Sequence, residues 1–353
     1  MIKLPSFLLL GTLVLGACAP ASAAQARIDN AARKTLLATL RARLLASYVF
    51  PDKAKLVAER VAAQEKAGAY SALADPAALA AALTRDLREP THDLHLEVAY
   101  SAEALPADID APRPSPEAER MMRRYLKAEN YGVRKVEALP GNIGYIDLRS
   151  FAPLPLARPF VSAAMALVAD TDALIVDLRS NGGGDPATVA WISSYLFDKR
   201  THLNDLYWRE GKRLQQYWTR TDVPGKKFGG TRKVYVLTSR DTFSGAEEFS
   251  YNLKQLGRAT IVGETTGGGA HPGRSHRLHP HLSVFIPNGR AINPITKTNW
   301  EGSGVTPDVA VASPDALAAA ERLAVREMLK VPGDTERAQV LRTRLQVLDK
   351  SSQ

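Results

Sequence analysis

The sequence predicts an α/β protein in which an N-terminal bundle of three helices precedes a sheet of mainly parallel strands covered by helices. Two observations predict this class. Residues 27–87 carry apolar side chains at helical spacing, interrupted by proline or glycine. From Ile143 onward, short apolar runs alternate with helical patterns, which is typical of parallel βαβ units buried on both faces.

The composition is that of a folded globular chain. Of 353 residues, 45% are hydrophobic and 24% are charged, which excludes disorder as the main state and also excludes a membrane bundle. The net charge is +9, but the basic residues are scattered and do not alternate with aromatics. A solvated basic surface is therefore favoured over nucleic-acid binding. A single cysteine excludes an internal disulfide.

Residues 1–23 have the pattern of a secretory signal peptide. Lys3 precedes an apolar run over 7–16, and small residues follow at 21–23. The only cysteine, Cys18, ends the motif "LGAC", which resembles a bacterial lipobox and implies cleavage before Cys18 and lipidation of its sulfur. The alternative is cleavage after residue 23. In both cases we expect export, to the periplasm or as an outer-membrane-anchored lipoprotein of a bacterium.

We expect four segments along the chain. A signal peptide at 1–23 is followed by a helical domain at 24–90, an α/β domain at 91–330 and a C-terminal helix or tail at 331–353. Breaks in the helical domain fall at 50–52, 68–76 and 89–90. The expected strands are 94–100, 143–148, 173–178, 234–238 and 260–262, and the expected helices are 117–130, 156–169, 186–197 and 245–256. Residues 206–218 predict a hairpin, whose aromatic side chains either line a substrate entrance or hold the hairpin together.

One predicted strand-to-helix turn is rich in glycine. The segment "DLRSNGGGDPA" places Gly182, Gly183 and Gly184 directly after a strand. Glycines there allow positive φ, and their N–H groups can converge on an anion. The spacing matches neither a phosphate-binding P-loop nor a dinucleotide fingerprint. The alternative is a simple tight turn.

A second such turn carries a serine. In "TSRDTFSGAEEF", Ser244 and Gly245 stand where a helix begins, and helix N-termini favour a developing negative charge. Ser244 is therefore either a helix N-cap or a nucleophile. The glycine-rich turn at Gly182–Gly184, together with a histidine and a carboxylate elsewhere in the chain, favours the role of Ser244 as a nucleophile.

The general base and the orienting carboxylate come from two other motifs. In "HDLHLEV", we favour His95 over His92 as the base because His95 enters a predicted strand. Glu301 lies between glycines in "NWEGSGVTPDV" and is either the third member of a nucleophilic triad or a surface residue. The histidines at 271, 276, 279 and 281 fall in a predicted loop without carboxylate partners, so we expect no metal site there.

Taken together, six segments resemble the S41 serine peptidases, and they occur in the same order. They are "HDLHLEV", "GNIGYIDLRSF", "ALIVDLRSNGGG", "VYVLTSRDTFSGAEEF", "GRATIVGETTGGGA" and "AINPITKTNWEGSGVTPDVAV". The resemblance covers about 94–311 and implies a ClpP/crotonase-like spiral of βα units. The helical domain before it is similar to that of bacterial relatives of the interphotoreceptor retinoid-binding protein.

The sequence departs from the C-terminal processing peptidases of this family in two ways, which narrows the subfamily that it resembles. Gly269 stands where C-terminal processing peptidases have the lysine of a Ser-Lys pair, and the segment between Val98 and Gly141 is too short for a PDZ domain. This leaves a tricorn-like arrangement, which implies Ser244, His95 and Glu301 as the triad. The serine that precedes the tricorn histidine is Leu94 here, so the orientation of His95 stays open.

The expected function is an exported serine-type peptidase that forms an acyl-enzyme on peptide or protein substrates. N–H groups of Gly183 and Gly245 would hold the oxyanion, Gly182 and Gly184 would contact substrate, and no cofactor or metal is required. The main alternative is a non-catalytic binding protein for a retinoid or fatty acid. A crotonase-like acyl-CoA enzyme is a third possibility.

Overall fold

The computed structural model describes residues 27–107, 109–110, 115–331 and 334–350. The predicted signal peptide, with Cys18, lies outside these residues. The chain forms two compact units. Unit 1 comprises Met1–Ser115, Trp208–Lys212 and His271–Arg290, and unit 2 comprises Pro116–Tyr207, Arg213–Ala270 and Ala291–Gln353.

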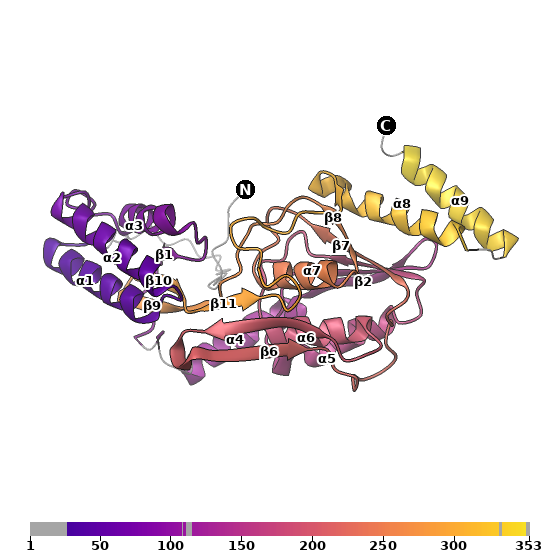
Figure 1. Cartoon of the computed structure of the whole chain (residues 1–353), viewed down its shortest axis with the longest axis horizontal. Helices are drawn as coiled ribbons and strands as arrows, with labels where there is room; N and C mark the ends of the chain where they lie inside the picture. Colours follow the sequence, from indigo (N-terminus) through magenta and orange to yellow (C-terminus); the bar gives the residue numbers. More distant parts are fainter. Residues whose placement is uncertain (1–26, 108, 111–114, 332–333, 351–353) are drawn as a thin grey trace, which may run out of the picture. The chain divides into compact units, whose positions relative to one another are not determined.

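Unit 1 contains the three predicted helices, shown in indigo and purple in Figure 1. They are α1 (Asn30–Ser47), α2 (Pro51–Lys66) and α3 (Pro76–Thr91). Asp29 and Asp75 cap α1 and α3 by accepting hydrogen bonds from backbone N–H groups. Leucines three to four residues apart on α1, such as Leu36, Leu40 and Leu44, are fully buried, as the helical spacing predicts.

The end of α3 differs from the prediction. A break was expected at Glu89–Pro90, but the helix continues to Thr91. Proline removes only one N–H donor in the last turn, and His92 then ends the helix with φ 56°. The N–H of His92 donates to the carbonyl of Arg88 at 2.7 Å. The chain therefore leaves α3 at a defined angle just before the histidine motif.

Unit 1 also contains an antiparallel sheet of order β1-β10-β9. Its strands are β1 (Glu97–Tyr100), β9 (Gly273–His279) and β10 (Leu282–Pro287). The prediction of a loop over the histidine-rich segment was wrong, because β9 includes His276 and His279. The apolar side chains of β10 supply the buried face, while β9 pairs with it through backbone hydrogen bonds that do not depend on side-chain polarity.

Unit 2 is built on a six-stranded sheet of order β12-β8-β7-β4-β3-β2. Its strands are β2 (Val133–Leu139), β3 (Ile143–Leu148), β4 (Ala173–Asp177), β7 (Lys233–Thr238), β8 (Thr260–Gly263) and β12 (Val309–Ala310). Neighbours are parallel except for the edge strand β2, which pairs with β3 in antiparallel fashion. The predicted parallel βαβ arrangement is confirmed.

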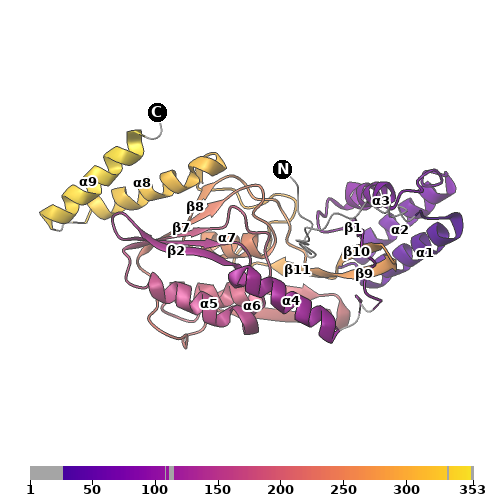
Figure 2. The ribbon, with the colours of Figure 1, turned by 180° about the vertical axis from the view of Figure 1, so that it is seen from behind.

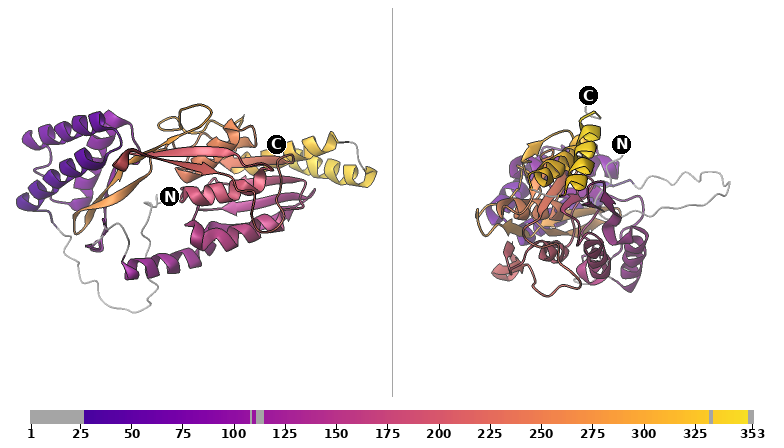
Figure 3. Two further views of the ribbon diagram at one scale, coloured as in Figure 1. Left: turned by 60° about the horizontal axis from the view of Figure 1, so that its bottom comes forward. Right: turned by 90° about the vertical axis from the view of Figure 1, so that its right-hand side faces the viewer.

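Helices cover both faces of this sheet, as Figure 2 shows from behind. They are α4 (Pro116–Ala128), α5 (Leu154–Leu167), α6 (Pro186–Ser193), α7 (Gly245–Gln255), α8 (Ala316–Leu329) and α9 (Thr335–Lys350). Val176 and Val236 pack with α5, α6 and α7, whereas their neighbours Ile175 and Leu237 pack with α8. Both faces of the strands are therefore buried, and α8 pairs with α9 (Figure 3).

The predicted hairpin is confirmed. Strands β5 (His202–Trp208) and β6 (Arg213–Trp218) are neighbours in a sheet of order β11-β5-β6, with β11 formed by Gly289–Ile292. The ring of Trp218 stacks on His202, with 4.2 Å between centroids, and Arg200 lies 4.5 Å from the same ring centroid. These contacts favour a stabilising role for this aromatic side chain. None of the described helices combines the length and the apolar character needed to cross a membrane.

Candidate active site

Ser244 occupies a strained turn between β7 and α7. Its φ and ψ are 53° and −117°, a combination that residues with a side chain rarely adopt. Such conformations cost on the order of 1–3 kcal/mol and persist only where the surroundings impose them. The turn holds the half-buried Ser244 at the N-terminus of α7, where the N–H groups and the helix dipole favour negative charge.

Glu247 holds this turn, although it was not among the site residues predicted from the sequence. One carboxylate oxygen, Oε2, accepts hydrogen bonds from the N–H groups of Ser244 and Gly269, both at 2.8 Å. The other, Oε1, accepts from Thr266 Oγ1 at 2.5 Å and from the N–H of Gly268 at 2.6 Å. Burial raises the pKa of Glu247 to about 7, and the four donors act in the opposite direction. The Ser-x-x-Glu spacing of a capping box was the available signal.

The glycine loop packs directly against the serine turn. Gly183 has φ 106°, and a Cβ added there would lie 2.7 Å from the nitrogen of Gly245 and 2.9 Å from Cβ of Ser244. A Cβ on Gly245 would in turn lie 2.9 Å from the nitrogen of Gly184. Only glycine allows this approach of the two backbones. The two predicted turns thus form one structure within unit 2.

One of the two predicted oxyanion donors already has a hydrogen-bond partner. The N–H of Gly183 donates to Oδ1 of Asn181 at 2.8 Å, so it is already engaged, which argues against the predicted oxyanion role of Gly183. Among the described residues, no hydrogen bond is found from the N–H groups of Gly184 or Gly245. These two amides therefore remain available for an anion beside Ser244.

Glu301 lies in a loop that is bound to the segment holding Ser244. Its Oε2 accepts a hydrogen bond from the N–H of Ala270 at 2.6 Å. Trp300 Nε1 donates to the carbonyl of Gly269 at 2.7 Å, and the N–H of Gly302 donates to the carbonyl of Gly268 at 2.9 Å. Residues 268–270 therefore contact Glu247 on one side and the Glu301 loop on the other. Unit 2 connects Ser244 and Glu301 through this segment.

His95 belongs to unit 1 and lies just before β1, not inside a strand as predicted. Its N–H donates to Oδ1 of Asp93 at 3.1 Å, and its ring centroid lies 5.9 Å from that of Phe285. Burial lowers the pKa of His95 to about 4, whereas the negative charge of Asp93 raises it. The imidazole is therefore neutral at neutral pH, which is the form that accepts a proton.

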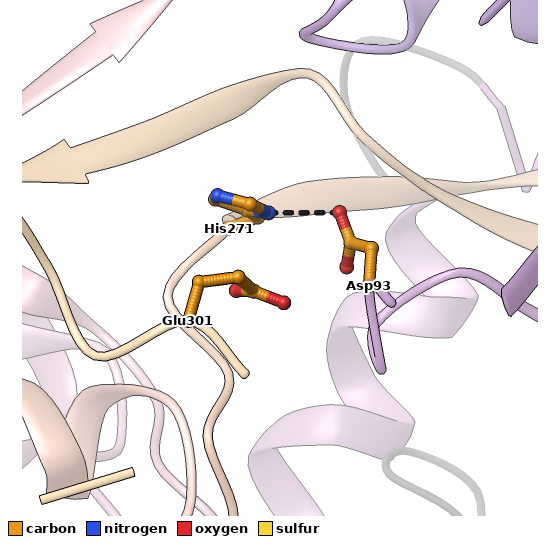
Figure 4. Close-up of side chains that lie close together, drawn as sticks. All are labelled: Asp93, His271 and Glu301. Atoms are coloured by element: carbon orange, nitrogen blue, oxygen red, sulfur yellow. Dashed lines mark hydrogen bonds and ion pairs between the residues drawn. The ribbon is translucent and has the colours of Figure 1, made fainter. Parts of the chain in front are cut away.

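Asp93 is the buried anion of this region. Its Oδ2 lies 2.8 Å from Nδ1 of His271, as Figure 4 shows, and accepts a hydrogen bond from the Tyr48 hydroxyl at 3.0 Å. Hydrogen bonds and the charges of His271 and His95 hold the pKa of Asp93 below its usual value, although burial acts against them. The expectation that His271 lacks a carboxylate partner was wrong, because its partner is remote in sequence.

The predicted site residues thus fall into two groups. Ser244, Glu301, Gly245 and the glycine loop belong to unit 2, and His95 belongs to unit 1 together with Asp93 and His271. Each group is organised by buried hydrogen bonds. The joining of the two groups into one triad is part of the proposal below.

Two sequence models match most of the described chain. A model of peptidase family S41 matches residues 142–311, and a model of the N-terminal domain of peptidase S41 in eukaryotic IRBP matches residues 29–130. The chain belongs to peptidase family S41. This membership confirms the motif resemblance.

Individual relatives support the family and the fold. The carboxy-terminal processing protease CtpB of Bacillus subtilis (strain 168) is 25% identical over 227 residues, which are 63% of the S41 chain and 45% of that relative. The S41 chain thus matches less than half the length of this protease. A peptidase structure from Parabacteroides merdae ATCC 43184 has a TM-score of 0.55 and 21% identity, covering 83% of the S41 chain and 96% of its own.

A lipoprotein structure from Streptococcus agalactiae has a TM-score of 0.53 and 14% identity, covering 89% of the S41 chain and all of its own chain, 100%. These structural likenesses confirm the fold class, an α/β core with a helical N-terminal part. The three relatives named here are bacterial.

Proposed function

We propose that this S41 chain is an exported peptidase that cleaves peptide bonds through an acyl-enzyme formed on Ser244. The observation that carries the proposal is the strained turn of Ser244 at the start of α7, beside available backbone donors. A serine that served only as a helix cap would not need this conformation. Family membership supplies the reaction class.

The proposed reaction uses three side chains. His95 takes the proton of the Ser244 hydroxyl as Oγ attacks the carbonyl carbon of the peptide bond, and Glu301 orients the imidazole. His95 then gives this proton to the leaving amine. Water hydrolyses the resulting ester with His95 again as the base, which releases the acid product and restores Ser244.

We assign the oxyanion to the N–H groups of Gly245 and Gly184. Gly245 was predicted for this role, and Gly184 takes the place of Gly183 because the Gly183 N–H is bonded to Asn181. Donors fixed in the backbone need no reorganisation as charge develops on the carbonyl oxygen. Gly182 and Gly183 remain candidates for contact with the substrate backbone.

The test is covalent labelling of purified protein with a fluorophosphonate, followed by mass mapping of the modified residue. We expect labelling at Ser244 in the wild type, and neither labelling nor hydrolysis in Ser244→Ala, with an unchanged melting temperature. Hydrolysis retained by Ser244→Ala would remove this serine from the mechanism. A wild-type protein that is not labelled by the fluorophosphonate but binds retinol or a fatty acid would favour the binding-protein alternative.

Export is a separate part of the proposal, supported by the signal-peptide pattern of residues 1–23 and the lipobox resemblance at Cys18. We expect the full-length protein in the membrane fraction of a bacterial host, labelled by radioactive palmitate. The Cys18→Ser variant should lose the label. A protein that stays in the cytoplasm with an intact N-terminus would contradict export.

A further inference from the structure

A stripe of polar side chains continues from Ser244 along α7 into the interior of unit 2. Glu248 and Asn252 follow Ser244 at intervals of four residues, so the three positions lie on one face of the helix. Glu248 is 3% exposed and Asn252 is fully buried. Side chains of this kind are rarely buried unless they have partners.

Asn204, from the central strand β5, reaches the same carboxyl group. The amides of Asn204 and Asn252 lie close enough to Glu248 to favour its charged form. Yet among the described residues, Oε1 of Glu248 and both polar atoms of each amide have no hydrogen-bond partner of good geometry. Leaving buried polar groups without partners is costly, so five such atoms in one place point to a ligand.

The surroundings of this cluster are negative. Asp185 at the start of α6 is the charged group that acts on Glu248, and both its carboxylate oxygens are already bound, to the N–H groups of Ala187 and Leu154 at 2.9 Å. Tyr217 on β6 faces the same carboxylates, since Glu248 and Asp185 both raise its pKa in addition to burial. Burial raises the pKa of Glu248 to about 8, and Asp185 adds to this rise.

We propose that Glu248, Asn204 and Asn252 form the floor of a pocket for a basic side chain, lysine or arginine, that flanks the peptide bond cleaved at Ser244. This inference rests on the proposed peptidase function. The cluster offers three unpartnered acceptor oxygens, and lysine and arginine carry donors only. An entering cation also offsets the charge of Asp185. Its binding ionises Glu248 and releases one proton, so affinity for a basic side chain rises with pH up to the pKa of Glu248.

The catalytic test uses internally quenched peptides that are identical except for one residue next to the cleaved bond, either lysine or norleucine. We expect the wild type to prefer lysine by at least about tenfold in kcat/KM. Glu248→Gln keeps the shape of the side chain but removes its ability to carry a negative charge. The ratio of kcat/KM for the lysine peptide to that for the norleucine peptide should therefore fall close to one. Glu119→Gln, an exposed substitution on α4, should keep the wild-type ratio. A wild type without preference for lysine, or an unchanged ratio in Glu248→Gln, overturns the pocket.

A binding test separates the pocket from the chemistry. In the Ser244→Ala background, calorimetry should show a higher affinity for Nα-acetyl-lysine amide than for the norleucine analogue. Binding of the lysine amide should release a proton, and this release should depend on Glu248. Fluorophosphonate labelling of Ser244 in the wild type reports the proposed function on its own. Labelling of Ser244 together with equal affinity for the two amides would contradict the proposed pocket but not the proposed peptidase function. Selective binding of the lysine amide without labelling of Ser244 would support the pocket and contradict the peptidase function.

Discussion

At the scale of single residues, burial changes the pKa of His95, the proposed general base. A free histidine has a pKa near 6.5, but burial lowers that of His95 to about 4. The unprotonated form, which accepts the Ser244 proton, should therefore persist to about pH 5. We expect the acid limb of the kcat/KM profile to lie below that value, measured with an uncharged peptide substrate. A limb near pH 6.5 would contradict the assignment of His95 or its burial.

Gly183 is a second residue whose effect can be predicted. A Cβ at this position would lie within 3 Å of the backbone of Gly245 and the side chain of Ser244. Gly183→Ala should displace the proposed oxyanion donor and lower kcat by ~10²-fold or more. Gly225→Ala is the matched control, because Gly225 also has a positive φ, 78°, but no atom within 4 Å of the added carbon. Equal kcat values for the two variants would refute the role of the close approach.

At the scale of elements, the start of α7 depends on Glu247. Each of its two oxygens accepts two hydrogen bonds, and glutamine has only one oxygen. Glu247→Gln therefore places an NH₂ group against two donors and should lower the free energy of unfolding by about 1–3 kcal/mol. Hydrolysis should fall as the Ser244 turn loosens. Urea denaturation checks this, with Glu119→Gln as the exposed control; equal stability of both variants would argue against the network.

The elements also show which parts of the fold are locally encoded. The strand and helix positions around Ser244, the parallel direction of the strands that alternate with helices, and the hairpin followed from apolar periodicity and turn residues. Strand β9 did not, because its sequence GRSHRLH has a single apolar side chain, Leu278, and its pairing is supplied by β10. The end of α3 also escaped prediction, since a proline in a last turn costs little.

At the scale of the whole molecule, the buried Glu248 makes stability depend on pH. Its pKa is raised to about 8 in the folded protein, so the folded state keeps a proton that the unfolded chain has released. The free energy of unfolding should therefore fall as pH rises from about 5 to about 8, by up to about 1.4 kcal/mol per pH unit. Glu248→Gln should flatten this slope in urea titrations. A slope that is the same in both proteins would contradict the raised pKa.

The sequence by itself determined the helices and parallel strands around Ser244, the family motifs and the candidates Ser244, His95 and Glu301. These depend on spacing and composition, which are local properties of the chain. Only the tertiary structure decided that Asp93 pairs with His271, 178 residues away, that Glu247 gathers four donors, and that the Gly183 N–H is already bonded to Asn181. The physical reason is that burial and hydrogen-bond partners are set by segments remote in sequence. Their effect on pKa and donor availability exists only once the chain has folded.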